Sequence, residues 1–281
     1  MTQAVPARSV GSTIAGALAI PSSGAVAAVF SRSCYLDLNG RIFALVAPEL
    51  LRGPLNVVVA PPERFAFEQL PAGAAVRLRP PTLTIAGGPT VDLAQAERWD
   101  AGLPPLVPAA GARLRQGMER IKEVLAGAPV ESLAHPAFRP ARAAEGMDAL
   151  HSGLRARNSA AVAAGVQCLA GLGLGLTPSG DDLLTGALVA IALLRPPHAA
   201  SVRGAVLEGT RGRTTRISRA YLEAAARGEA GEAWHLLALR LDEGPDEEIT
   251  TAAARVLAFG ETSGADLLVG FLLGLEALSE R

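Results

Sequence analysis

The first part of the chain alternates short apolar runs with turn residues, a pattern that predicts β-strands. The apolar runs lie at 25–30, 34–38, 41–46, 55–60, 75–79 and 82–85. Asn39 and Gly40 separate two of these runs, and this dipeptide supplies the positive φ angles of a two-residue hairpin turn. Prolines and glycines recur about every ten residues, which is typical of a small antiparallel sheet or barrel. We therefore expect a β-rich N-terminal region over 1–110, ending in a linker at 102–111.

The remainder of the chain, 111–281, has the apolar spacing of amphipathic helices. Leu114, Met118, Ile121 and Leu125 recur at intervals of three and four residues and define one helix face. Further helices are predicted at 159–170, 182–194, 215–227, 232–241, 247–259 and 266–278. Two of these segments, 182–194 and 266–278, are apolar nearly all round and therefore belong at the centre of a helical bundle. The fold class that follows is α+β, with a β-rich region followed by a bundle.

Composition and charge exclude several classes of protein. Hydrophobic residues make up 49% of the chain and charged residues 19%, which excludes extensive disorder. The net charge of −1 gives no basic field to attract nucleic acid. The longest apolar runs are shorter than the roughly 18–20 residues of a membrane span. We therefore expect a cytoplasmic protein with no nucleic-acid partner and no membrane association.

The metal-binding side chains of this sequence are dispersed. Cys34 and Cys168 lie far apart, and the four histidines follow no ligand spacing. Cys168 stands in an apolar stretch typical of a buried thiol. These observations predict no metal site and no cofactor.

A short repeat opens the two central helices and carries the clearest functional signal. Residues 179–186 and 263–270 both read Ser-Gly-x-Asp-Leu-Leu-x-Gly. A glycine-rich turn before a helix leaves N–H groups unpaired, and with the helix dipole these favour an anion. We expect the two helix starts to face each other across one anion pocket, where Gly180 and Gly264 allow close approach of a ligand. Hydroxyl donors to that pocket would come from Thr177, Ser179, Thr262 and Ser263.

The repeat also permits a purely structural interpretation, because Ser, Thr and Asp before an apolar run are ordinary helix caps. Asp182 and Asp266 are equivalent in the two copies and suit a structural role. Asp181 has Ala265 as its counterpart and is therefore the better candidate for chemistry. We name Asp181 and Asp182 as catalytic candidates. Two adjacent carboxylates could also hold Mg²⁺ with a phosphate, but consecutive helix residues point in different directions.

A basic cluster lies between the two copies of the repeat. It consists of Arg203, Arg211, Arg213, Arg216 and Arg219. The last two are three residues apart on one predicted helix face, where guanidinium groups could grip a carboxylate or phosphate bidentately. Thr214 or Thr215 would cap this helix. The alternative is a solvated helix face in an arginine-rich composition.

Three segments together resemble one bacterial family. They are Gly-Leu-Thr-Pro-Ser-Gly-Asp-Asp at 175–182, Thr-Thr-Arg-Ile-Ser-Arg-Ala-Tyr-Leu at 214–222 and Thr-Ser-Gly-Ala-Asp at 262–266. The family was long of unknown function and includes the AllH subunit of oxamate carbamoyltransferase, from allantoin breakdown. The resemblance implies carbamoyl transfer between phosphate and oxamate or a similar small amide or carboxylate. It also implies FdrA-like and AllG-like partner subunits.

The predicted site follows from the repeat and the basic cluster. Its substrate-binding residues are Thr177, Ser179, Gly180, Arg216, Ser218, Arg219, Thr262, Ser263, Gly264 and Asp266. The expected ligand is a small anion such as carbamoyl phosphate or oxamate. The alternative function is a non-catalytic subunit that binds a small anion or assembles a multi-protein complex.

Overall fold

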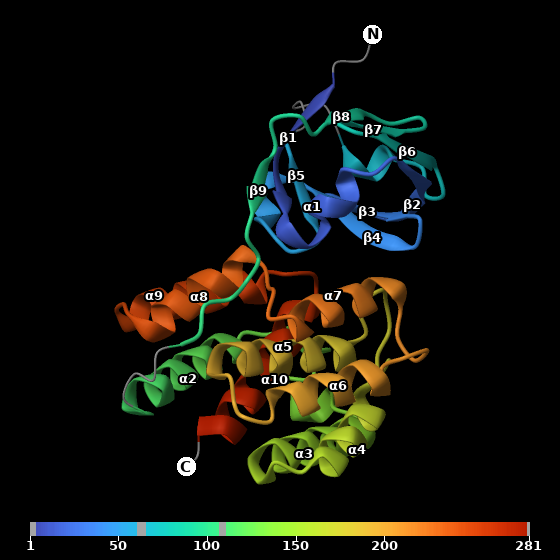
Figure 1. The fold of residues 1–281 in the computed structure, drawn as a ribbon. Coiled ribbons are helices and arrows are strands. Elements are labelled where there is room, and N and C mark those ends of the chain that lie inside the picture. The colour runs from blue at the N-terminus through green and yellow to red at the C-terminus, as the bar shows by residue number, and fades with distance from the viewer. Residues whose placement is uncertain (1–3, 61–65, 107–110, 280–281) are drawn as a thin grey trace. The chain divides into compact units, whose positions relative to one another are not determined.

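The computed structural model describes residues 4–60, 66–106 and 111–279 (Figure 1). The chain divides into two compact units, Met1–Ala101 and Gly102–Arg281. The first unit is built of strands and the second of helices, which confirms the α+β class.

Among the described residues of the N-terminal unit, nine strands form one sheet. They are β1 (Val5–Gly11), β2 (Ser22–Phe30), β3 (Ser33–Leu38), β4 (Arg41–Val46), β5 (Asn56–Val59), β6 (Ala75–Arg79), β7 (Thr82–Ile85), β8 (Thr90–Asp92) and β9 (Glu97–Trp99). The strand order is β5-β4-β3-β2-β6-β7-β8-β1, and β1 pairs again with β5, so eight strands close into a barrel (Figure 1). The ninth strand, β9, runs parallel to the second half of β1. Closure leaves the eight strands no long free edge.

Local sequence explains the regular parts of this barrel. Asn39 and Gly40 have φ angles of 48° and 85°, so the predicted hairpin between β3 and β4 is confirmed. The strands β6 and β7 pair antiparallel, and their buried residues alternate with exposed ones. Facing pairs such as Leu78 and Leu83 therefore fill the interior, as the two-residue period of a strand requires. A short helix, α1 (Ser12–Leu18), follows β1, and 3₁₀ turns lie at η1 (Pro48–Leu50) and η2 (Phe67–Gln69).

Nine α-helices are described in the C-terminal unit. They are α2 (Gly111–Leu125), α3 (Ala141–Ala156), α4 (Ser159–Leu169), α5 (Ser179–Leu194), α6 (Ala199–Gly209), α7 (Arg216–Ala226), α8 (Glu232–Asp242), α9 (Asp246–Leu257) and α10 (Ser263–Ser279), with a 3₁₀ turn η3 (Pro136–Phe138). The two predicted central helices are α5 and α10, which lie in the middle of the unit (Figure 1). One core joins them to α2, α8 and α9, and another joins them to α3, α4, α6 and α7. Within the described ranges, no helix is both long and apolar enough to cross a membrane.

The repeat in the sequence forms a reciprocal contact between α5 and α10. A Cβ placed on Gly186 would lie 1.9 Å from the carbonyl oxygen of Leu267. A Cβ placed on Gly270 would lie 1.8 Å from the carbonyl oxygen of Leu183. In the repeat, Gly186 is equivalent to Gly270, and Leu183 to Leu267. The same contact is therefore made twice, as it would be by two helices related by a two-fold axis. Only glycine permits the two backbones to approach this closely.

The predicted linker is in part a piece of the helical unit. The N–H of Leu103 donates to the carbonyl of Gly228 at 2.8 Å, and that of Leu106 to the carbonyl of Leu193 at 3.0 Å. The Leu103 side chain is buried in the core around α2 and α8. Residues 102–106 therefore do not form a free linker, because their leucines pack while the intervening prolines keep the backbone extended. Residues 107–110 lie outside the described residues.

Candidate functional site

The starts of α5 and α10 meet at the hydroxyl groups of the repeat. Thr177 Oγ1 and Ser263 Oγ are 3.0 Å apart and share a hydrogen bond. Hydroxyls of Ser263 and Thr177 hydrogen-bond the Asp182 carboxyl, while those of Ser179 and Thr262 hydrogen-bond the Asp266 carboxyl. Each carboxyl thus takes one hydroxyl from its own helix start and one from the other copy. We call these four hydroxyls and two carboxyls the paired helix starts.

Asp182 and Asp266 are buried at the paired helix starts, with 6% and 0% of their surfaces exposed. Burial raises the pKa of Asp182 well above its usual value, and the nearby charges of Asp266 and Asp181 raise it further. Burial also raises the pKa of Asp266, to about 6, although the N–H of Leu133, 2.7 Å from Oδ1, opposes the rise. The Oδ2 atom of each carboxyl is buried and has no hydrogen-bond partner. Nothing in the sequence indicated the contact with Leu133, because Leu133 lies 133 residues before Asp266, in a segment that connects two helices.

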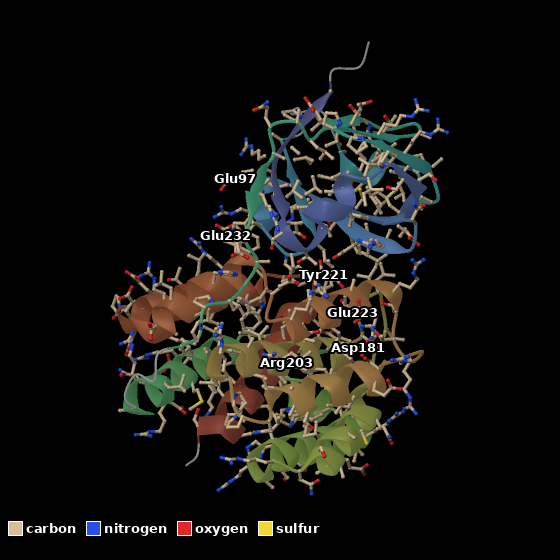
Figure 2. All side chains as sticks on the ribbon, viewed as in Figure 1. Glu97, Asp181, Arg203, Tyr221, Glu223 and Glu232 are labelled. Carbon is tan, nitrogen blue, oxygen red and sulfur yellow. The ribbon has the colours of Figure 1, made fainter. Side chains whose placement is uncertain are left out.

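Asp181 has a different environment from Asp182. Its Oδ1 accepts the N–H of Gly171 at 2.9 Å, its Oδ2 accepts the hydroxyl of Thr214, and Ser218 also hydrogen-bonds it. Burial raises the pKa of Asp181, and these hydrogen bonds lower it. Asp181 therefore joins the glycine turn, α5 and the start of α7, and it lies on the side of the helical unit near α7 (Figure 2). Its catalytic role stays a prediction; the geometry gives it three structural partners.

The second, third and fourth N–H groups of each of the two helices are hydrogen-bonded within the protein. The N–H of Gly180 donates to the carbonyl of Leu172, and that of Gly264 to the carbonyl of Phe259, both at 2.8 Å. Pro178 and Thr262 carbonyls accept the next two N–H groups of each helix. Our expectation of unpaired N–H groups is therefore wrong for residues 180–182 and 264–266, because the preceding residues supply acceptors; for Ser179 and Ser263 it stays a prediction.

The two repeat glycines allow close packing of the preceding helices. A Cβ on Gly180 would lie 2.0 Å from the carbonyl oxygen of Leu169, at the end of α4. A Cβ on Gly264 would lie 2.3 Å from the carbonyl oxygen of Leu257, at the end of α9. The structure thus accounts for both glycines by helix packing, and their contact with a ligand stays a prediction.

A glycine turn covers the start of α5. Gly171, Gly173 and Gly175 have φ angles of 68°, 117° and 91°, a region that favours glycine. A Cβ on Gly173 would lie 2.7 Å from the Ser179 nitrogen, so the turn rests directly on the first residue of α5. Leu174, at its tip, is 96% exposed. The base of the turn therefore packs against the start of α5, whereas the tip is exposed to solvent.

The start of α7 joins the same region. Thr215 caps this helix by accepting the N–H of Ser218 at 3.0 Å, and its hydroxyl donates to the carbonyl of Leu176 at 2.5 Å. Further along α7, the ring of Tyr221 meets that of Phe259 edge-on, with 6.2 Å between centroids. Three helix starts, those of α5, α7 and α10, are thereby connected.

The two arginines predicted to act together have separate surroundings. Arg219 donates from Nε to Glu223 at 2.7 Å and from a terminal nitrogen to the Leu207 carbonyl at 2.5 Å and to Thr210 at 3.1 Å. It thus fastens α7 to the end of α6. Arg216 is exposed on the first turn of α7. The hydrogen bonds of Arg219 are made to the protein, and a ligand contact for either residue stays a prediction. Among the described residues, no three His, Cys, Asp or Glu side chains gather into a group that could hold a metal ion.

Two family models match the chain, one in each unit. The model described as the AllH family N-terminal domain matches residues 7–98, which include most of the barrel. The model described as oxamate carbamoyltransferase subunit AllH matches residues 169–275, which include the three connected helix starts. No solved structure matches the chain. The two matches cover most of its length, and the chain belongs to the AllH family of oxamate carbamoyltransferase subunits.

Proposed function

We propose that this chain is the subunit of a carbamoyltransferase in which the paired helix starts bind the small substrates. The reaction moves a carbamoyl group between phosphate and oxamate, or a similar small amide or carboxylate. In the synthetic direction, the amide nitrogen forms a bond to the carbamoyl carbon, and the bond from that carbon to the phosphate oxygen breaks. The observation that carries this proposal is the pair of buried carboxyl groups, each with an unpartnered oxygen, within the segment that the family model matches.

Electrostatics at the connected helix starts support small-anion chemistry. The N-terminal end of each helix carries a partial positive charge, and three such ends lie near one another. Burial raises the pKa of Asp182 well above its usual value, which favours the uncharged form of this carboxyl and so reduces its repulsion of an anion. The hydroxyls of Ser179 and Ser263 are held in place by their hydrogen bonds to Asp266 and Asp182, so their dipoles have fixed directions. Fixed dipoles of this kind stabilise charge that develops during acyl transfer without having to reorganise.

Partner subunits belong to the proposal, since the family description names a subunit. We expect FdrA-like and AllG-like proteins to complete the enzyme in the cytoplasm, and we assign this chain no cofactor. The test is reconstitution from three purified proteins, with carbamoyl phosphate and oxamate supplied and phosphate release measured. Turnover that requires this chain supports the proposal, and undiminished turnover in its absence contradicts it.

A non-catalytic role in binding or assembly is the alternative, and one observation favours it. The hydroxyls of Thr177 and Ser263 join the two helix starts to each other, as a structural clamp would. The replacement Asp182→Ala, which removes the hydrogen-bonding group that asparagine would imitate, separates the two functions when complex formation and turnover are measured on the same sample. A complex that assembles but loses turnover supports catalysis at this site. A complex that assembles and keeps its full turnover supports the assembly role.

A further inference from the structure

We infer that Asp182 and Asp266 together bind the carboxamide group of the substrate, with Asp266 accepting an N–H hydrogen bond and Asp182 donating to the amide oxygen. This inference rests on the proposed function, because it assigns one part of the amide substrate to two residues of the same site. It differs from that proposal in naming the group that is recognised and the two atoms that recognise it.

Each of the two unpartnered oxygens leaves a buried carboxyl with an unused hydrogen-bonding position. The Oδ2 atoms of Asp182 and Asp266 are the only oxygens of the paired helix starts, within the part of the chain described, that are buried without any partner. An ionised carboxylate can only accept hydrogen bonds, and a buried acceptor without a donor is unfavourable. The charged groups that act on Asp182 are both acidic, namely Asp266 and Asp181. No ion pair therefore compensates for the burial of Asp182.

A primary amide matches the two carboxyls because they differ in protonation. Burial and two neighbouring acids favour the protonated form of Asp182, which then offers an O–H donor. Asp266 experiences mainly burial, opposed by hydrogen bonds from Leu133, Ser179 and Thr262, and its pKa of about 6 leaves it ionised at neutral pH. A donor and an acceptor within one hydrogen-bonded cluster match the C=O and N–H groups of a carboxamide. Separation of two carboxyl pKa values by their environments is a common basis for acid and base roles.

The same geometry assigns the proton in the transfer step. As the amide nitrogen bonds to the carbamoyl carbon of carbamoyl phosphate, its N–H proton passes to Asp266. The electron pair of the breaking C–O bond leaves with phosphate, which finally takes up the proton. No redox partner is needed, and atoms and charge balance.

Entry of the amide requires a local opening, because the two Oδ2 atoms are buried in this structure. We assign that opening to the glycine turn, which rests on Ser179, a hydrogen-bond partner of Asp266. The turn is suited to such movement. A Cβ on Gly175 would meet no atom within 4 Å, and Leu174 at the tip is almost fully exposed. The two ends of the turn are held by hydrogen bonds, from Gly171 to Asp181 and from Thr215 to the carbonyl of Leu176, so the part free to move is the tip at Leu174 and Gly175.

The test compares oxamate with pyruvate, which has a methyl group in place of the amide NH₂ and is otherwise alike. Calorimetric titration of the full chain, and of its complex with the partner subunits, gives both dissociation constants. We expect oxamate to bind at least about tenfold more tightly than pyruvate, the effect of one hydrogen bond to a charged group. The replacement Asp266→Asn should abolish this preference, whereas Asp182→Asn should preserve it, because both ligands carry the carbonyl oxygen that Asp182 contacts. The exposed Asp148 of α3 provides the matched control, Asp148→Asn, which should preserve the preference.

Three results would overturn the inference: equal affinity of wild-type protein for the two ligands, no binding of oxamate to chain or complex, or an undiminished preference in Asp266→Asn. Turnover measurements separate this inference from the proposed function. A complex that turns over equally well with Asp266→Asn leaves the function standing and removes the amide site. A preference for oxamate without carbamoyl transfer leaves the amide site standing and removes the function.

Discussion

Replacement of Asp266 by asparagine should change how the stability of the helical unit depends on pH. Asparagine preserves the oxygen that accepts the N–H of Leu133 and removes the ionisable proton. Burial raises the pKa of this carboxyl from its ordinary 3.8 to about 6 in the folded protein. The folded state therefore binds the proton more tightly than the unfolded state. The stabilisation that comes from protonating Asp266 is fully present below pH 3.8 and is lost as the pH rises through about 6.

The magnitude follows from the two pKa values. The difference between 3.8 and about 6, at 1.36 kcal/mol per pH unit, is about 3 kcal/mol. We expect the free energy of unfolding of the variant, relative to wild type, to rise by this amount between pH 3.5 and pH 7.5. Loss of the Asp266 charge also removes one cause of the raised pKa of Asp182, which acts in the same direction. An unsatisfied amide N–H in the variant would lower its stability equally at every pH.

Urea unfolding, followed by ellipticity at 222 nm at several pH values, measures this effect. The long helices all lie in residues 102–281, so the signal reports that unit. The exposed Asp148→Asn provides a control for the loss of one carboxylate. Unfolding free energies of wild type and Asp266→Asn that differ by a constant amount across the pH range would refute the reasoning.

Three further predictions concern packing, hydrogen bonding and thiol reactivity. Gly270→Ala should lower the free energy of unfolding by about 1–3 kcal/mol, because the added Cβ meets a carbonyl oxygen of α5. In the control Gly204→Ala, the added Cβ meets no atom within 4 Å, and the free energy of unfolding should rise by up to about 1 kcal/mol. Equal effects of the two replacements in thermal unfolding would contradict this prediction. Arg113→Ala removes hydrogen bonds of 2.8–3.1 Å to carbonyls at the end of α8 and should cost about 2–3 kcal/mol, so an unchanged urea midpoint would argue against it. Burial raises the pKa of Cys34 to about 12, so a thiol-specific reagent should modify the half-buried Cys168 first and reach Cys34 only on unfolding; rapid loss of both thiols in the native protein would disprove the prediction.

Local periodicity was sufficient to predict most regular elements. The hairpin at Asn39 and Gly40 follows from a dipeptide that readily adopts positive φ. The central helices α5 and α10 follow from runs that are apolar on every face. The helix that begins at Arg216 follows from the threonine cap before it. In each case the signal lies within about one or two turns of the chain, which is why it can be read without the tertiary structure.

Some strands carried too little local signal to be predicted. The strand β1 mixes apolar residues with Arg8 and Ser9, and β8 and β9 are only three residues each. Their pairing depends on partners that are distant in sequence. The barrel closes because β1 finds β5 on one side and β8 and β9 on the other. Distant pairings of this kind set which segments become strands.

That two copies of one motif open two central helices can be read from the amino-acid sequence alone. Tertiary structure decided what the motif does with its polar groups. The N–H groups of Gly180 and Gly264 are used by turns that fold back, and Asp181 is surrounded by hydrogen-bond donors. Asp182 and Asp266 instead keep one unpartnered oxygen each. Burial and hydrogen bonding depend on which distant segments come together, and these environments, rather than residue type, set the protonation of each carboxyl.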